Sequence, residues 1–516
     1  MPVKSKKEKG KIMKRIKMSG LSIKQTIFAF LLLPFAFAVV PAQTETPPAP
    51  GAPRSVQIPA VKEMKLANGL TVAVVERRSV PLVTVQLLVK SGAEIEAMEK
   101  AGLANMTASL LTKGTKTRTA TQIAEEMEFL GGSINAGAGW NNSVVTIGTM
   151  SGKLDAAMAI MADVVLNPSF KQEEIDLLKS QTLDGLTYNL KQPGFLATYV
   201  ASRYSFGEHP AGGTPSSLSA VTREDIAGFH STNYKPYSAV LIFAGDITSE
   251  NANKLAEKYF GGWDGKGSGR GGGFGSSIGT GNGDLKSNIA RRILVVDLPK
   301  SGQASVNYAK NLATNGRGGD QYYPASVLNS LLGGGYSSRL NQEIRIKRGL
   351  SYGAGSGFAW RSSKSNFSTR TQTKNESAAE VAELVMAEIK KLTQGSIADV
   401  ELNPRKSVLT GNFGRNLETT GGLAAQIADL YSFGLPTGEL NDYMKRVQTV
   451  SDRQIRDFAG VNLIGGDIII VGDYAVFKDD LAKRFPNTTI EVIKADDLDL
   501  SKENLRRTGE AVKIGS

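Results

Sequence analysis

The sequence contains no cysteine and only two histidines, His209 and His230, among its 516 residues. Without cysteine the chain can form no disulfide, and it has no thiolate to act as a nucleophile or as a metal ligand. It also has no cysteine that could carry the lipid anchor of a lipoprotein. The two histidines lie far apart from the motifs described below, and we interpret both as structural residues.

Most of the excess positive charge lies at the N-terminus. The formal net charge is +12, but residues 1–24 hold nine Lys or Arg and one Glu, a net +8. The rest of the chain therefore carries about +4 (12 − 8), too little to suggest a surface for nucleic acid or another polyanion. We expect no nucleic-acid partner.

Long hydrophobic runs are missing as well. The apolar run Ile27–Val40 spans about 14 residues, whereas a membrane helix needs about 20. A basic segment before it and the small residues of Val40-Pro41-Ala42 after it predict a secretory signal peptide over residues 1–42. The alternatives are cleavage after Ala38 and an uncleaved anchor. We expect a periplasmic protein without stable membrane association after cleavage, preceded by a Pro-rich disordered spacer over residues 43–60.

A glycine-rich stretch divides the remaining chain into two halves. Residues 262–285 contain too much glycine for regular structure and predict a linker. We expect an N-terminal domain over residues 61–261, a C-terminal domain over 286–496 and a tail over 497–516.

The two halves repeat each other. Three segments recur in the same order at offsets of 227, 229 and 227 residues: Tyr204-Ser-Phe-Gly207 as Tyr431-Ser-Phe-Gly434, Val221-Thr-x-x-x-Ile226-x-x-Phe229 as Val450-Ser-x-x-x-Ile455-x-x-Phe458, and Gly245-Asp246 as Gly472-Asp473. This period is far longer than that of a solenoid and indicates a duplication. The predicted fold class is α+β, with two duplicated domains that each pack helices on a mixed, mainly antiparallel sheet.

Local patterns support this class. Asn68-Gly69 between apolar segments predicts a β-hairpin, and further strands are expected at 83–89, 134–137, 143–150, 239–244 and 292–297. Helical periodicity predicts helices at 101–113, 154–165 and 172–190, and another at 121–130 with Thr121 as its N-cap.

The first of these helices carries a recognisable frame, Gly102-Leu-Ala-Asn-Met-Thr-Ala-Ser-Leu-Leu-Thr-Lys-Gly-Thr115. Together with the duplication, this frame resembles the pitrilysin/insulinase family of metallopeptidases, the inverzincins, in which a similar helix carries H-x-x-E-H. The two histidines of that motif bind zinc and its glutamate activates a water molecule.

In this sequence the three motif positions are occupied by Asn105, Ala108 and Ser109. Asparagine and serine provide no imidazole, and alanine provides no base. The family's third ligand is a Glu about 76 residues further on; the corresponding residues Leu183–Leu186 contain no Glu, and Asp184 alone could not hold a metal. We expect a degenerate motif that binds no zinc, and no cofactor in this chain.

A second stretch, Gly333–Tyr352, has an arginine-rich middle between three glycines and a tyrosine. Taken alone, it could be a helix–loop–helix connection with a solvated charged face. However, it is similar to the zinc-less bacterial subunits of the family's two-subunit branch, which resembles the mitochondrial processing peptidase. Those subunits keep an Arg/Tyr pair seven residues apart, which Arg345 and Tyr352 match.

The resemblance implies a function shared between two chains. This chain would be the zinc-less subunit of a heterodimeric metallopeptidase, inactive alone, and its partner would be a homologous subunit with H-x-x-E-H and zinc. Arg345 and Tyr352 would bind the substrate carbonyl and stabilise the transition state in that partner's site. The adjoining residues Gly333, Gly334, Gly335 and Ser338 are predicted to bind peptide substrates or to order the loop.

The segment Ser133–Gly139 occupies the position of the strand to which this family adds its substrate, although we favour an ordinary strand and turn as its interpretation. Two other functions stay open. The chain could be a non-catalytic scaffold or peptide-binding protein of the same fold, or a zinc peptidase with unconventional ligands.

Overall fold

The computed structural model describes residues 58–264, 290–313, 316–362, 364–507 and 513–514. The predicted signal peptide, most of the spacer and most of the glycine-rich linker lie outside these residues. In the part of the chain that is described, no helix is both long and apolar enough to cross a membrane.

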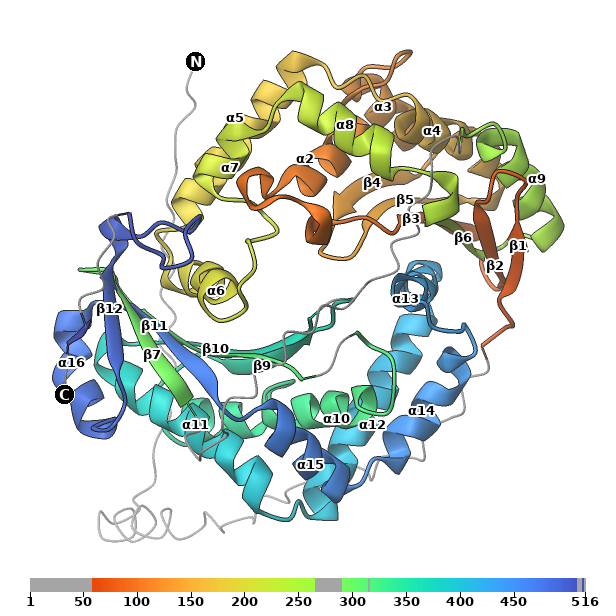
Figure 1. The fold of residues 1–516 in the computed structure, drawn as a ribbon. Helices are drawn as coiled ribbons and strands as arrows, with labels where there is room; N and C mark the ends of the chain where they lie inside the picture. Colours follow the sequence, from red (N-terminus) through yellow and green to blue (C-terminus); the bar gives the residue numbers. More distant parts are fainter. Residues whose placement is uncertain (1–57, 265–289, 314–315, 363, 508–512, 515–516) are drawn as a thin grey trace, which may run out of the picture. The chain divides into compact units, whose positions relative to one another are not determined.

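The first half folds around a six-stranded sheet (Figure 1). Its strands are β1 (Lys62–Lys65), β2 (Thr71–Glu76), β3 (Leu82–Val89), β4 (Ser133–Ala138), β5 (Ser143–Met150) and β6 (Ala239–Gly245). They lie in the order β1-β2-β6-β3-β5-β4, with β2 and β6 parallel and every other described neighbour antiparallel. The predicted hairpin is present as β1 and β2, with Gly69 of its turn at φ 95°, a conformation that favours glycine.

The second half folds around a seven-stranded sheet. Its strands are β7 (Ala290–Asp297), β8 (Ala304–Asn311), β9 (Ala354–Ala359), β10 (Asn366–Thr373), β11 (Gly466–Gly472), β12 (Ile490–Lys494) and β13 (Lys513–Ile514). Their order is β13-β12-β7-β11-β8-β10-β9, with β7 parallel to both β11 and β12. The predicted α+β class with two mainly antiparallel sheets is thereby confirmed.

The sheets confirm the duplication. The run β2-β6-β3-β5-β4 has the same pairing directions as β7-β11-β8-β10-β9. The repeated Gly-Asp pairs begin at the equivalent ends of β6 and β11. Only the strands beyond β2 and β7 differ, because β1 pairs antiparallel with β2 whereas β12 pairs parallel with β7.

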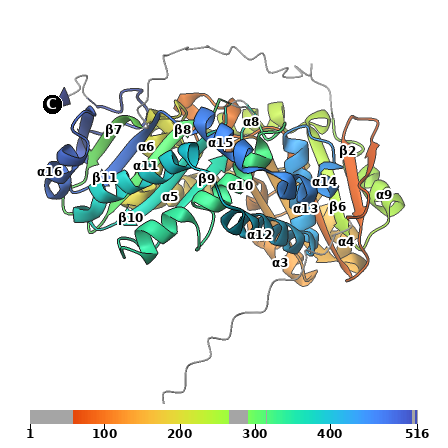
Figure 2. The same cartoon turned by 90° about the horizontal axis from the view of Figure 1, so that it is seen from below.

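Helices cover both sheets. Those of the first half are α2 (Leu103–Leu110), α3 (Ala120–Phe129), α4 (Leu154–Leu166), α5 (Gln172–Asn189), α6 (Pro193–Tyr204), α7 (Pro215–Ala220), α8 (Arg223–Asn233) and α9 (Ser249–Phe260). Those of the second half are α10 (Tyr322–Leu332), the π-helix η7 (Asn341–Ile346), α11 (Ala378–Gln394), α12 (Asp399–Leu417), α13 (Thr420–Ser432), α14 (Glu439–Thr449), α15 (Asp452–Asn462) and α16 (Tyr474–Arg484). In Figure 2, α11 lies along β10 and the neighbouring strands.

One predicted helix start is wrong. The N-cap of α3 is Thr119 and not Thr121. The Thr119 hydroxyl accepts a hydrogen bond from the Gln122 backbone N–H at 3.2 Å, and the Gln122 side chain accepts one from the Thr119 N–H at 2.9 Å. This capping box needs Glu or Gln three residues after the cap, which Thr119 has and Thr121 lacks.

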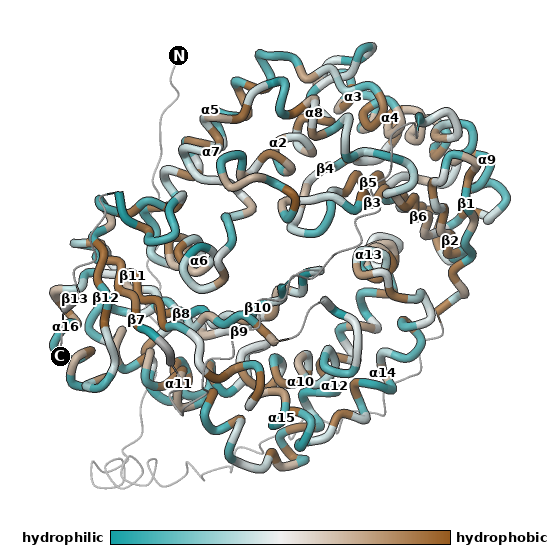
Figure 3. The backbone as a smooth tube through the Cα atoms, viewed as in Figure 1, coloured by the Kyte–Doolittle hydropathy of each residue, from teal (hydrophilic) through white to brown (hydrophobic). Residues whose placement is uncertain are grey.

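Strands β2, β3 and β6 are buried on both faces, and Figure 3 shows hydrophobic residues gathered along the central strands of both sheets. Along β2, Val72 and Val74 belong to the core of the first half, whereas Ala73 and Val75 belong to a core shared with the second half. Residues that alternate in this way along a strand point to opposite faces of the sheet. The second face of the first sheet therefore needs a cover from elsewhere.

That cover is α13, from the second half. Its Leu423, Ala424 and Ile427 are buried in the shared core, and the helix lies against β3 and β6. Conversely, α6 of the first half lies against β8 and β11 and buries Leu196 and Val200 there. Each half thus covers one face of its sheet with a helix from the other half.

The two exchanged helices are themselves repeat equivalents. Leu196-Ala-x-x-Val200-Ala-x-x-Tyr204 leads into the first repeated segment, just as Leu423-Ala-x-x-Ile427-Ala-x-x-Tyr431 leads into the second. The exchange is therefore reciprocal. Fully burying each such aliphatic side chain contributes about 1.5–3 kcal/mol, so the two halves stabilise each other.

Candidate functional site

The Gly333–Tyr352 stretch begins with a glycine loop that packs closely on β9. A Cβ atom on Gly333 would lie 2.3 Å from the Ser356 backbone nitrogen, and one on Gly334 would lie 2.9 Å from the Asn329 carbonyl oxygen. These approaches exclude any side chain without a backbone shift. Gly335 faces open space instead, and it is exposed together with Gly334.

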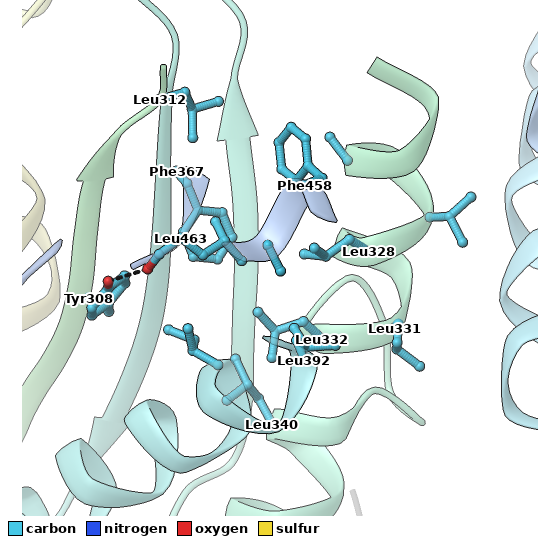
Figure 4. Packing of buried hydrophobic residues seen from close by; sticks show 14 of the residues in the cluster. Tyr308, Leu312, Leu328, Leu331, Leu332, Leu340, Phe367, Leu392, Phe458 and Leu463 are labelled. Atoms are coloured by element: carbon cyan, nitrogen blue, oxygen red, sulfur yellow. Dashed lines mark hydrogen bonds between the residues drawn. The ribbon is translucent and has the colours of Figure 1, made fainter. Parts of the chain in front are cut away.

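Buried residues anchor the loop to the core of the second half. Leu340 and Ile344 are fully buried, and Figure 4 shows Leu340 packed near Leu332 and Leu392. Ser338 is also fully buried, at the point where its carbonyl accepts a hydrogen bond from the Gln342 N–H at 2.8 Å. Among the predicted substrate-binding residues, Gly334 and Gly335 are therefore the exposed ones.

Arg345 projects from the π-helix η7, which follows this anchor. A π-helical turn is uncommon and is frequently found at functional sites. The Arg345 carbonyl accepts a hydrogen bond from Gly349 N–H at 2.9 Å, and Gly349 has φ 64°, so the chain reverses directly after the basic residues.

The other cations of this stretch have acidic partners. Glu343 accepts hydrogen bonds from Lys347 and from the Arg348 Nη1 atom, the latter at 2.6 Å. The bond from Lys347, with a further contribution from Arg348, lowers the pKa of Glu343. Arg339 forms a bidentate pair with Glu401 at 2.8 and 2.7 Å. Lys347 and Arg348 thus share Glu343, and Arg339 is paired with Glu401.

Arg345 differs from these neighbours. Among the described residues its guanidinium has no hydrogen-bond or ion-pair partner. The half-buried side chain lies against the ring of Tyr336, whose centroid is 4.9 Å from the Arg345 Cζ atom. The five N–H donors of Arg345 are therefore unpaired within the described part of the chain.

Tyr352 also presents an unused polar group. Its side chain is 89% exposed, the highest value among the large hydrophobic residues described. The Ser351 hydroxyl donates to the Gly353 carbonyl at 2.7 Å and accepts from the Gly353 N–H at 3.0 Å, which holds a tight turn around Tyr352. The structure does not bring Tyr352 into contact with Arg345, so the two residues present separate donors to the outside.

The degenerate zinc motif lies on α2, beside β4, α5 and α8. Asn105 is exposed, Ser109 is half-buried and Ala108 is fully buried. Asp184, in the region of the third ligand, is an exposed residue of α5. This set contains no imidazole, and its one carboxylate is that of the exposed Asp184, so it does not provide the ligands that zinc requires.

The two histidines lie elsewhere. His209 is buried against the Trp140 ring, and His230 has its Nε2 2.8 Å from the Val165 carbonyl oxygen while it stacks on Tyr234. Within the described residues, no three His, Asp or Glu side chains are grouped as a metal site would require.

Glu96 holds the start of the motif helix. Its carboxylate accepts backbone hydrogen bonds from Gly102, at 2.9 Å, and from Ala104. Burial of this side chain raises its pKa to about 7, although the two backbone hydrogen bonds act in the opposite direction. The nearest ionisable side chain, His209, lies 3.8 Å away and has its own pKa lowered by burial.

This raised pKa predicts a pH dependence of stability. A carboxyl group whose pKa is higher in the folded state stabilises the fold fully below its unfolded value of 4.5, and this stabilisation is lost as pH rises through about 7. Between pH 4.5 and about 7, the free energy of unfolding should fall less steeply with pH in Glu96→Gln than in the unmodified chain. The difference in slope is up to about 1.4 kcal/mol per pH unit. Urea unfolding of both proteins from pH 5 to 8 measures the difference.

The comparison of the two proteins removes the opposite contribution of His230, whose pKa is lowered by burial in both. Parallel curves for Glu96→Gln and the unmodified chain would show that Glu96 does not titrate in this window.

Strand β4 supplies the predicted edge. It pairs with β5 alone, so one side of its backbone has no strand partner within the described residues. A Cβ atom on Gly137 would meet nothing within 4 Å. The predicted edge position of Ser133–Gly139 agrees with this topology, whereas its use by a peptide stays a prediction.

Sequence reasoning overlooked two residues of this region. The sequence indicates for Tyr336 no more than a place in the glycine loop, and it gives no signal for Glu96. An acid six residues before the N-cap Gly102 is a capping signal only when the intervening chain folds back, which sequence spacing does not reveal.

Comparisons with known proteins match both halves. Residues 71–192 match the family model described as Insulinase (Peptidase family M16), and residues 220–409 match the model described as Peptidase M16 inactive domain.

Curated relatives and solved structures agree with these matches. An uncharacterized zinc protease of Rickettsia bellii is 30% identical over 297 residues, which cover 57% of this chain and 68% of the relative. One from Rickettsia felis is 27% identical over 352 residues, 67% of this chain and 82% of the relative. A peptidase M16 inactive domain from Pseudomonas fluorescens has a TM-score of 0.71 at 24% identity and covers 80% of this chain and 98% of its own. A protease from Helicobacter pylori also has a TM-score of 0.71, at 22% identity, with coverages of 81% and 100%.

Proposed function

This chain belongs to peptidase family M16, and from that premise we propose that it is the zinc-less subunit of a two-chain peptidase. In this proposal it supplies Arg345 and Tyr352 to the zinc site of a homologous subunit. It is exported to the periplasm and acts there on peptides or unfolded segments.

The observation that carries the proposal is the free guanidinium of Arg345. In a stretch where Arg339, Lys347 and Arg348 are all paired with acids, Arg345 has no hydrogen-bond or ion-pair partner among the residues that the structure describes, and it lies on a firmly anchored helix. An arginine held in place without a partner is suited to an anionic group that arrives from outside.

Peptide hydrolysis generates such a group. Attack on the scissile carbonyl turns its oxygen into an oxyanion, and fixed donors at that position stabilise the transition state by about 3 kcal/mol each. Arg345 remains charged at any relevant pH, and the Tyr352 hydroxyl is an exposed O–H donor. Both side chains can bind an oxyanion, but neither can activate water, so hydrolysis requires a second chain.

The degenerate motif supports this division of work. Asn105, Ala108 and Ser109 provide neither zinc ligands nor a base, so the partner has to provide the H-x-x-E-H motif with its metal. The free edge of β4 is available for an extended peptide, which would bind through main-chain hydrogen bonds with little sequence preference.

The test compares the purified chain alone with the same chain mixed with a zinc-bearing homologue. The mature chain alone is expected to contain far less than one zinc per molecule and to cleave no unfolded peptide. After mixing with an H-x-x-E-H homologue from the same organism, the two chains should elute together and cleave the peptide. Metal analysis, size-exclusion chromatography and a fluorogenic peptide assay measure these three properties.

The other outcomes separate the alternatives. Stoichiometric zinc in the isolated chain would overturn the interpretation of Asn105, Ala108 and Ser109. A stable complex whose activity equals that of the partner alone would favour a scaffold of the same fold.

A further inference from the structure

The contact between Tyr336 and Arg345 is the starting point. The Tyr336 side chain is 64% exposed, so it contributes little to the core, yet its ring lies 4.9 Å from the Arg345 Cζ atom. A cation within about 6 Å of an aromatic centroid is attracted to the ring. An exposed aromatic residue on a glycine loop thus holds the one unpaired arginine of the stretch.

The backbone of Tyr336 is itself held in place. Asn341, which is buried, donates a hydrogen bond from its side-chain amide to the Tyr336 carbonyl. The Asn341 side-chain oxygen accepts one from the Ala354 N–H at 3.4 Å. On the following residue, Ser337, both the carbonyl and the hydroxyl accept hydrogen bonds from Arg405. The loop, η7 and the start of β9 are thereby joined around the ring.

A ring holds an arginine in a way that a carboxylate cannot. A carboxylate accepts two of the guanidinium's N–H groups, as Glu401 does for Arg339. A ring face attracts the charge without offering the lone pairs that a carboxylate gives to two N–H groups. Tyr336 can therefore restrict where Arg345 lies and still leave its donors free for a substrate.

We propose that Tyr336 is the positioning residue for Arg345: its ring fixes the guanidinium for the partner's substrate. This inference rests on the proposed function, because positioning matters only if Arg345 binds substrate. Tyr336 acts through Arg345 and needs no contact with the reacting atoms.

The test is a double-mutant cycle in the two-chain complex. Tyr336→Leu is expected to lower kcat about threefold to fivefold with KM nearly unchanged, as loss of a weak cation–π contact predicts. Tyr336→Phe keeps the ring and should stay within about twofold of the unmodified complex. In the Arg345→Ala background, Tyr336→Leu should cause no further loss. Tyr188→Leu is the matched control, since Tyr188 is 67% exposed on α5 and has no arginine contact among the described residues.

A second measurement needs no partner. Phenylglyoxal modifies accessible arginines, and mass spectrometry follows the rate at each site of the full chain. Tyr336→Leu should accelerate modification of Arg345 about twofold or more relative to Arg453, an arginine with an 85% exposed side chain on α15. Tyr336→Phe should leave this ratio unchanged.

The results distinguish the two proposals. If Arg345→Ala lowers activity while Tyr336→Leu does not, or lowers it equally in the Arg345→Ala background, the positioning role is wrong and the proposed function stands. If Arg345→Ala itself leaves activity unchanged, the proposed function is wrong. An unchanged modification rate of Arg345 in Tyr336→Leu would overturn the positioning role independently of any partner.

Discussion

In the complex with a zinc-bearing homologue, Arg345→Ala is expected to lower kcat and kcat/KM equally, by about a hundredfold. Removing one fixed donor from an oxyanion site raises the barrier by about 3 kcal/mol, and an equal loss in both parameters indicates an interaction made only in the transition state. Tyr352→Phe removes a single hydroxyl that is exposed to the outside and should cause a loss of similar size. Steady-state cleavage of a fluorogenic peptide measures both variants.

The double variant should lose less than the product of the two single losses, because both donors serve the same developing charge. Arg348→Ala is the matched control. It removes an arginine from the same turn, but one that is paired with Glu343, and activity should stay within about twofold. Unchanged activity in the double variant would contradict the catalytic role, whereas a loss in Arg348→Ala as large as in Arg345→Ala would indicate a general charge effect.

The second large effect concerns the exchanged helices. Ile427→Ala in α13 should lower the free energy of unfolding by about 2–5 kcal/mol, because it leaves a cavity against the sheet of the first half. Val200→Ala at the repeat-equivalent position of α6 removes fewer atoms and should have a smaller effect of the same kind. Chemical denaturation gives the sizes of these changes.

Hydrogen exchange shows which segments of the chain lose stability in these variants. Because α13 lies on β3 and β6, Ile427→Ala should weaken amide protection in residues 82–89 and 239–245, more than 180 residues earlier in the chain. The control is Val461→Ala, which truncates a 60% exposed side chain on α15 and should leave stability within about 0.5 kcal/mol. Protection lost only in the second half would show that the halves unfold independently and that the exchange of helices does not couple them.

Much of the fold could be predicted from local patterns. Strand 143–150 and helix 154–165 were predicted within one residue of β5 and α4, because their apolar periodicity has one physical interpretation. The duplication was visible in short repeated segments. The wrong N-cap of α3 shows the limit of a one-residue criterion, since only the pair Thr119 and Gln122 identifies the start.

The exchange of α6 and α13 could not be predicted in this way. Both helices are amphipathic. The sequence of an amphipathic helix indicates which of its sides is buried, but it does not indicate against which sheet that side packs. The nearly continuous apolar sequences of β2, β3 and β6 indicate that both faces of these strands are covered. They do not identify the helix that covers the second face.

The sequence by itself determined the chemistry of the α2 motif. Asn105, Ala108 and Ser109 cannot bind zinc in any fold, because the ligands are a property of the side chains. It also determined that Arg345 and Tyr352 occur at their spacing. Only the tertiary structure decided which cation of that stretch is unpaired, because pairing depends on where acids such as Glu401 of α12 lie in space. The same arrangement placed Tyr336 against Arg345 and left the guanidinium's donors free.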